Sequence, residues 1–204
     1  MLSVLWSENK QKENIPTMKK FIALCLCAVL LLSLCACGKE KEPEVQEVSI
    51  ESAVALLDTV WQSYAEEEKF PCAGGDLDHA NMEGPGEYAV GSAEALDASF
   101  GIPAAEAAAV TEAASLMHMM NLNTFTAGAF RLADGTDKAA FAESVKANVL
   151  QRQWICGFPD TLVIIGVGDY AVSAYGEAGI IETFKTKTLA AYASAELLVE
   201  QSLA

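Results

Sequence analysis

An apolar stretch near the start of the chain most constrains what the rest of it can fold into. Residues Met18–Cys37 read MKKFIALCLCAVLLLSLCAC, in which Lys19 and Lys20 precede Phe21–Leu34, a largely apolar run of 14 residues. A positive start, an apolar centre and small residues at the end are the layout of a secretory signal peptide. A permanent membrane span needs about 20 apolar residues, so this run is too short to be one. We therefore expect residues 18–36 to be removed from the mature protein.

The end of this stretch is more specific than a general cleavage site. Leu34-Cys35-Ala36-Cys37 resembles the lipobox of bacterial lipoproteins: a large aliphatic residue, two small ones, and the cysteine that receives the lipid. The resemblance implies that Cys37 is the first mature residue and carries a diacylglyceryl thioether, whose two acyl chains anchor a protein stably. The expected location is the extracytoplasmic face of the cell membrane. The alternative is an ordinary secretory signal, after which Cys37 is a free thiol.

The segments on either side of the signal peptide fall outside its pattern. Residues 1–17 are polar and mixed in charge, and Met18 followed by two lysines has the form of a natural start, so we expect translation to begin at Met18. Residues 37–48 comprise the lipidated cysteine and a charged segment without hydrophobic periodicity, which predicts a flexible acidic tether. Its eleven residues after Cys37 reach roughly 40 Å when extended. Residues 49–204 are then long enough for a single domain.

The charge of the mature chain restricts its partners. Without residues 1–37 the chain has 9 basic and 26 acidic residues. So acidic a surface repels nucleic acid and anionic lipid head groups, and neither is an expected partner. The expected partners are the membrane, through the lipid anchor, and an envelope protein or ligand that the sequence does not identify.

Apolar periodicity predicts an α+β domain. Helices are predicted over 50–68, 92–100, 137–152 and 177–202, and strands over 115–122, 124–132, 161–167 and 170–175. Ser49, Ser92 and Thr136 are the predicted helix N-caps. Residues 104–114 either form a short helix or lead directly into a strand. Paired neighbouring strands favour a four-stranded antiparallel sheet in the order β-β-α-β-β-α, with helices mainly on one face and an N-terminal helix before it.

Three segments between Phe130 and Gly176 carry a resemblance to a known family. They are Ala133–Asp137, Leu150–Gln153 and Gly168–Val172. Together with the signal peptide, tether and strand order, they resemble a family of bacterial lipoproteins known only as domain of unknown function number four-three-five-eight. The resemblance covers residues 110–176 best and departs at 72–91 and beyond Thr188. Such families have no assigned activity, so it implies location and fold and no catalytic residue.

The cysteines that remain after processing are Cys37, Cys72 and Cys156. Cys72 and Cys156 either form a disulfide, which an extracytoplasmic location permits, or are two separate buried thiols that behave as small hydrophobic groups.

A polar loop supplies the weak metal candidates Asp76, Asp78 and His79. Paired carboxylates and an imidazole are ligands for calcium or zinc. Counted from Asp76, however, a calcium-binding EF-hand loop needs an oxygen ligand at Ala80 and glycine at Asn81. A solvated polar loop is the simpler interpretation, and no metal or cofactor is predicted.

A second candidate, Met117-His118-Met119-Met120, combines thioether and imidazole groups that suit copper. In a strand, alternate residues face opposite sides, so the four side chains do not converge on one metal. Core packing, with methionine filling gaps, is the prediction.

No known catalytic grouping appears in the sequence. There is no Gly-x-Ser-x-Gly elbow, neither Cys72 nor Cys156 has a neighbouring histidine, and no glycine loop has the phosphate-binding pattern. The sequence favours a non-enzymatic binding or interaction module at the cell envelope. The alternative is an envelope hydrolase or metal-binding protein that uses Asp76, Asp78 and His79.

Overall fold

A computed structural model describes residues 50–204. The predicted mis-start extension, signal peptide, lipidation at Cys37 and tether therefore lie outside the described residues. The described part is α+β, as predicted, but its antiparallel sheet has seven strands and it contains five helices. The prediction of a four-stranded sheet is wrong.

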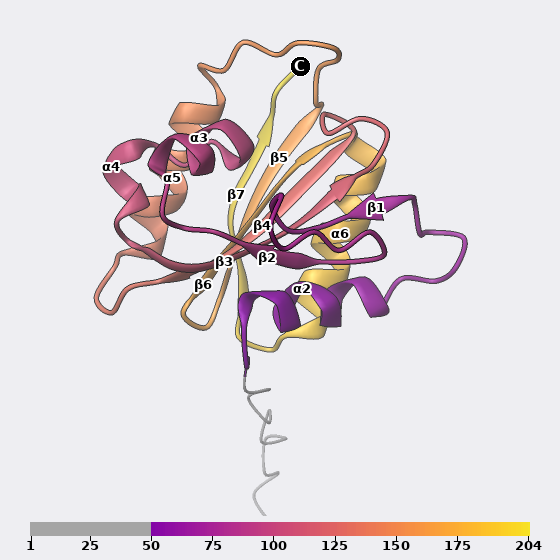
Figure 1. Ribbon diagram of the computed structural model, residues 1–204, viewed down its shortest axis with the longest axis horizontal. Helices are drawn as coiled ribbons and strands as arrows, with labels where there is room; N and C mark the ends of the chain where they lie inside the picture. The colour runs from indigo at the N-terminus through magenta and orange to yellow at the C-terminus, as the bar shows by residue number, and fades with distance from the viewer. Residues whose placement is uncertain (1–49) are drawn as a thin grey trace, which may run out of the picture. The chain divides into compact units, whose positions relative to one another are not determined.

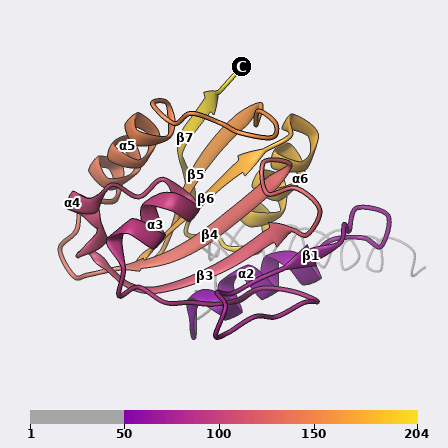
Figure 2. The ribbon, with the colours of Figure 1, turned by 45° about the horizontal axis from the view of Figure 1, so that its top comes forward.

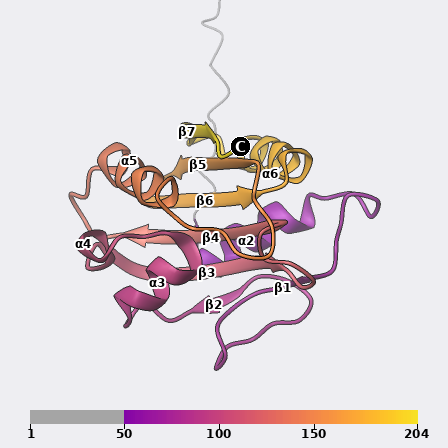
Figure 3. The ribbon, with the colours of Figure 1, turned by 90° about the horizontal axis from the view of Figure 1, so that it is seen from above.

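The elements follow one another in the order α2 (Ala53–Gln62), β1 (Cys72–Ala73), β2 (Gly86–Tyr88), α3 (Ala93–Phe100), α4 (Ala104–Ala107), β3 (Val110–His118), β4 (Phe125–Leu132), α5 (Lys138–Val149), β5 (Thr161–Val167), β6 (Tyr170–Gly176), α6 (Ala178–Ala191) and β7 (Ala195–Ser202). In the sheet the strands lie in the order β1-β3-β4-β6-β5-β7, and β2 also pairs with β3. Figure 3 shows the strands stacked in this order.

Helices cover both faces of the sheet, which corrects the expectation that they lie mainly on one. Helices α2 and α6 pack on one face, and α3, α4 and α5 pack on the other (Figures 1 and 2). The physical reason lies in the strands. All four side chains of Leu162–Ile165 in β5 are fully buried. Because successive strand residues point to opposite faces, a continuous apolar run needs cover on both sides.

The C-terminal segment, predicted as one helix over 177–202, divides into helix α6 and strand β7. Tyr192 has extended backbone angles (φ −130°, ψ 122°), which ends the helix. Strand β7 then pairs with the outer edge of β5 over the whole length of β5. A buried strand cannot leave its backbone N–H and C=O groups unpaired without a large desolvation cost. The need to pair β5 therefore outweighs the helical spacing of the apolar residues.

The helix N-caps agree with the sequence in one case and differ in two. Ser92 caps α3, as predicted, and the helix ends at Gly101, which has a left-handed conformation. Ser52 caps α2, accepting a hydrogen bond from the amide of Ala55 at 3.0 Å; the expected cap, Ser49, lies outside the described residues. Asp137 caps α5 in place of Thr136, because its carboxylate accepts from two amides of the first turn. A carboxylate there also interacts favourably with the positive end of the helix dipole.

The described residues contain their own hydrophobic core. Each face of the sheet closes on its helices around a separate cluster of buried side chains, drawn entirely from residues 53–199. Chain 38–204, which lacks the predicted lipid site, contains both of these clusters and is used for the experiments below. No helix within residues 50–204 is long and apolar enough to cross a membrane.

Candidate functional site

One edge of the sheet is made by an interrupted strand. Strands β1 and β2 pair with different parts of the same strand, β3: Cys72 lies opposite His118, and Gly86 lies opposite Ser115. Residues 74–85 leave the sheet between them as a loop, which we call the edge loop. The edge loop forms one wall of the candidate site.

Backbone hydrogen bonds and one buried serine hold the base of the edge loop. Gly74 and Asn81 exchange two backbone hydrogen bonds, of 2.8 and 2.9 Å. The hydroxyl of Ser115, fully buried on β3, accepts from the Gly75 amide at 2.8 Å and donates to the Gly75 carbonyl at 3.2 Å. Gly75 has φ +85°, a left-handed conformation that glycine adopts at low cost. The loop therefore has a defined geometry at its base.

A hollow of about 710 Å³ lies beside the edge loop, and we call it the loop hollow. Its walls come from the edge loop, from the ends of α3 and β2, and from the end of β3 with the residues after it. It is lined by Ala73, Gly74, Gly75, Asp76, Leu77, Asp78, Ala80, Met82, Tyr88, Ala95, Ser99, Met117, His118, Met119 and Leu122. A volume of this size is within the range of sites for drug-sized ligands.

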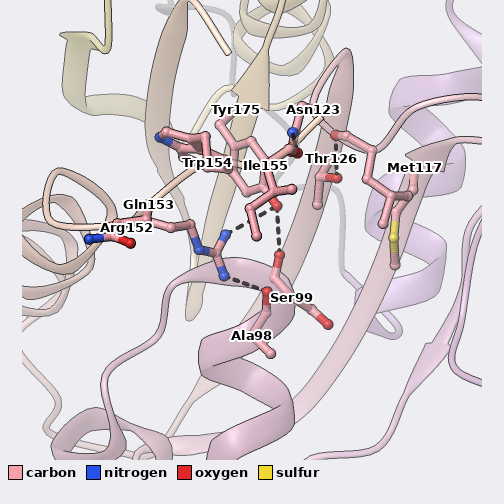
Figure 4. A pocket seen from close by; sticks show the side chains of 11 residues that line it. Ala98, Ser99, Met117, Asn123, Thr126, Arg152, Gln153, Trp154, Ile155 and Tyr175 are labelled. Atoms are coloured by element: carbon pink, nitrogen blue, oxygen red, sulfur yellow. Dashed lines mark hydrogen bonds between the residues drawn. The ribbon is translucent and has the colours of Figure 1, made fainter. Parts of the chain in front are cut away.

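A second hollow of about 280 Å³ adjoins the first, and Figure 4 shows its lining side chains. We call it the Trp154 hollow. The two hollows share Ser99, Met117 and Leu122, so they adjoin, and we call the pair the groove. The other residues of the Trp154 hollow are Ala98, Asn123, Thr126, Arg152, Gln153, Trp154, Ile155 and Tyr175.

Arg152 connects parts of the wall of the Trp154 hollow through hydrogen bonds (Figure 4). Its guanidinium donates to the backbone carbonyls of Asp97 and Ala98 and to the hydroxyl of Tyr175 at 3.3 Å. It also lies 5.1 Å from the ring centre of Trp154. The two carbonyls belong to the last turn of α3, where that of Asp97 also accepts from the Gly101 amide, and a cation is favoured at this end of the helix dipole. The charge of Arg152 is therefore engaged within the protein.

Two asparagines connect the loops at the far end of the groove. Asn123 donates to the carbonyls of Ile155 at 2.9 Å and Gly157 at 3.1 Å, and Asn121 donates to that of Cys156 at 3.3 Å. These bonds join the loop after β3 to the segment that follows α5. Segments more than thirty residues apart in the sequence thus share one wall.

Exposed apolar side chains gather around this groove. Nine large hydrophobic residues in the described part are exposed, and five of them line one or both hollows: Leu77, Met82, Met119, Leu122 and Ile155. Leu77 is 100% exposed and Ile155 79% exposed. Single exposed apolar residues are common on any protein surface, but a cluster at a hollow makes this groove the candidate functional site.

The structure brings Asp76 and His79 together in a local turn. The Asp76 carboxylate accepts hydrogen bonds from the amides of Ala89, Asp78 and His79 and from His79 Nδ1, all between 2.8 and 3.0 Å. The Ala89 amide is the main reason that the pKa of Asp76 falls to about 2, and the bond to Asp76 raises the pKa of His79. With four donors around it, this carboxylate stabilises the edge loop.

The weak metal candidates therefore do not form a cation site around Asp76. Asp78 lines the loop hollow but joins Asp76 through its backbone amide alone. Within residues 50–204 there is no group of three or more His, Cys, Asp or Glu side chains placed to hold a metal ion.

The two cysteines of the domain lie in different surroundings. Cys72 is buried on β1, and burial raises the pKa of its thiol. Cys156 is exposed in the segment after α5 and has φ +64°, a left-handed conformation. Both are free thiols in the structure. The expectation of two buried thiols holds for Cys72 alone, and oxidation to a disulfide stays a prediction.

The methionine run has a different place from the one predicted. Strand β3 ends at His118, so Met119 and Met120 lie beyond the sheet and are exposed by 49% and 80%. Met117, at the end of the strand, is half-buried between the two hollows. The prediction of core packing for all four residues is wrong. The turn residues Asn121 and Asn123, directly after the run, are the sequence signal that could have placed it at a strand end.

We compared the chain with family models, with curated proteins and with solved structures, and none of the three comparisons found a match. The resemblance to the lipoprotein family of unknown function stays a prediction.

Proposed function

We propose that this protein is a lipid-anchored binding module on the extracytoplasmic face of the cell membrane. It acts without catalysis, and its binding site is the groove formed by the loop hollow and the Trp154 hollow. The anchor is proposed from the lipobox-like sequence that ends at Cys37. The binding site is proposed from the cluster of five exposed apolar side chains at the groove.

The main support for the proposal is this cluster, because apolar surface that is exposed to water costs free energy. Burying an apolar side chain is worth roughly 1.5–3 kcal/mol, so a groove lined with several of them gains free energy when a ligand covers it. Hydrogen bonds of Ser115 and Arg152 also hold the walls of the groove. A pre-formed apolar groove can bind a ligand without large rearrangement.

A neutral fluorescent probe tests the groove as a binding site. N-phenyl-1-naphthylamine should bind chain 38–204, with increased probe emission. Leu122 lines both hollows and is 53% exposed, so Leu122→Ser should weaken probe binding about tenfold without unfolding the domain.

The matched control for this experiment is Leu150→Ser. Leu150 follows α5, is 51% exposed and lines neither hollow. The Leu150→Ser variant should bind the probe with the same affinity as the wild type. Equal affinities for the wild type and Leu122→Ser would contradict the groove as the site.

The anchor is tested separately in cells. With an inhibitor of the globomycin type, which blocks lipoprotein signal cleavage, an unprocessed precursor should accumulate. Cys37→Ala should prevent lipid labelling and, because cleavage requires the lipidated cysteine, should also leave the precursor unprocessed. Normal maturation under the inhibitor would rule out lipidation of Cys37.

A further inference from the structure

We infer that the groove binds a cationic amphipathic helical peptide, either free or as part of a partner protein. This inference rests on the proposed function and names the class of ligand. Three features of the groove carry it: its methionines, its apolar rim and the charge around it.

Methionine side chains supply much of the apolar lining of the loop hollow. Met82 comes from the edge loop, Met117 from the end of β3, and Met119 from the turn that follows. Methionine is unbranched and polarizable, so it adapts to an irregular apolar surface. The apolar stripe of an amphipathic helix, with side chains at i, i+3, i+4 and i+7, is a surface of this kind.

Further exposed apolar residues follow the lining residues in the chain, which favours a peptide over a small molecule. Met120 follows Met119 and is 80% exposed, and Phe158 lies three residues after Ile155 and is 78% exposed. Sites for small molecules enclose most of the ligand surface. Side chains outside the hollows are covered only by a ligand larger than the hollows themselves. A helix, about 10–12 Å across with its side chains, meets this condition.

The net negative charge of the domain favours a partner with positive charge. Residues 50–204 contain 22 acidic and 7 basic residues. Six of the seven basic side chains lie within 4.0 Å of a carboxylate, and the seventh, Arg152, donates to carbonyls and a hydroxyl. The basic side chains of these residues are therefore already paired within the domain, while most of the carboxylates have no basic side chain beside them. Asp78 lies in the wall of the loop hollow itself; the other carboxylate in that wall, Asp76, is engaged by four donors.

This charge pattern opposes the other candidates for the groove. A second copy of the domain carries the same excess of carboxylates and is repelled. An anionic lipid surface is repelled for the same reason. A cationic partner is attracted over a distance of about a Debye length and gains complementary contacts at the groove.

Two peptides of about 18 residues, or five helical turns, test the inference. Both have leucine at helical spacing on one face; the other face has lysine in the first and glutamate in the second. Chain 38–204 should bind the lysine peptide at least tenfold more tightly than the glutamate peptide, as measured by calorimetry. Raising the salt from about 0.05 M to about 0.5 M should reduce this difference.

Two pairs of variants separate groove binding from adhesion to the acidic surface. Leu122→Ser should weaken binding of the lysine peptide about tenfold, and Leu150→Ser should leave it unchanged. Asp78→Lys should weaken binding about two- to fivefold. Glu67→Lys makes the same change of charge at an exposed carboxylate outside the groove and should have a smaller effect. Circular dichroism confirms that each variant is folded.

Each contrary result has a definite meaning. If Leu122→Ser binds the lysine peptide as the wild type does, the attraction is to the acidic surface alone and the inference is wrong. If the naphthylamine probe binds but neither peptide does, the groove is a site for a small apolar molecule; the inference then fails and the proposed function stands. If neither the probe nor a peptide binds, both fail.

Discussion

Replacing Phe125 with alanine is expected to lower the free energy of unfolding by about 4 kcal/mol. Phe125 begins β4 and is fully buried. Its ring packs edge-on against Phe70 at 5.1 Å and Phe184 at 5.3 Å between ring centres. Alanine would remove these contacts and leave a cavity where α6, β4 and the segment after α2 meet. Urea denaturation of chain 38–204, followed by circular dichroism, measures the change.

Phe158→Ala is the matched control. It deletes the same atoms from a side chain that is 78% exposed, so the change in stability should stay within about 0.5 kcal/mol. Similar losses for the two variants would show that Phe125 does not occupy the core position described.

The second large effect is expected for Gly74→Ala. A Cβ atom there would lie against the backbone nitrogen of Gly86 and the carbonyl oxygen of Ser115, and 2.6 Å from the carbonyl oxygen of Gly84. All three neighbours are backbone atoms, so no side chain can turn aside to make room. We expect a loss of about 3 kcal/mol in stability. The base of the edge loop must also shift, which should weaken binding of the naphthylamine probe.

Gly91→Ala tests whether the effect of Gly74→Ala is local. A Cβ atom at Gly91 would meet nothing within 4 Å. Gly91 also lacks the positive φ found at several other glycines of residues 50–204. This variant should be as stable as the wild type or slightly more so, because alanine restricts the unfolded chain. A Gly74→Ala variant with unchanged stability would contradict the close packing of the edge loop on β3.

Several elements could be predicted because their local signals agree with their tertiary surroundings. The hairpin of β5 and β6 follows from two apolar runs joined at Gly168, which has φ +53°. Helix α3 follows from Ser92 at its start and Gly101 at its end. In both cases the residues that begin or end the element lie next to it in the sequence.

The candidate site could not be predicted in the same way, because its parts lie far apart in the chain. Leu77, Leu122 and Ile155 line one groove, yet no local pattern relates them. The sequence did single out Asp76, Asp78 and His79, but these residues look like ligands only until the amide donors around Asp76 are seen.

By itself, the sequence determined the composition-dependent properties: the strong negative charge, the strand and helix segments with clear periodicity, and the lipobox-like pattern that underlies the proposed anchor. These depend on residue type and on near neighbours. Only the tertiary structure decided that residues 195–202 pair with β5, that helices cover both faces of the sheet, and that Met119, directly after β3, lines a groove. Each of these depends on which backbone groups and apolar surfaces remain uncovered once the other elements are in place, and a local pattern contains no information about that.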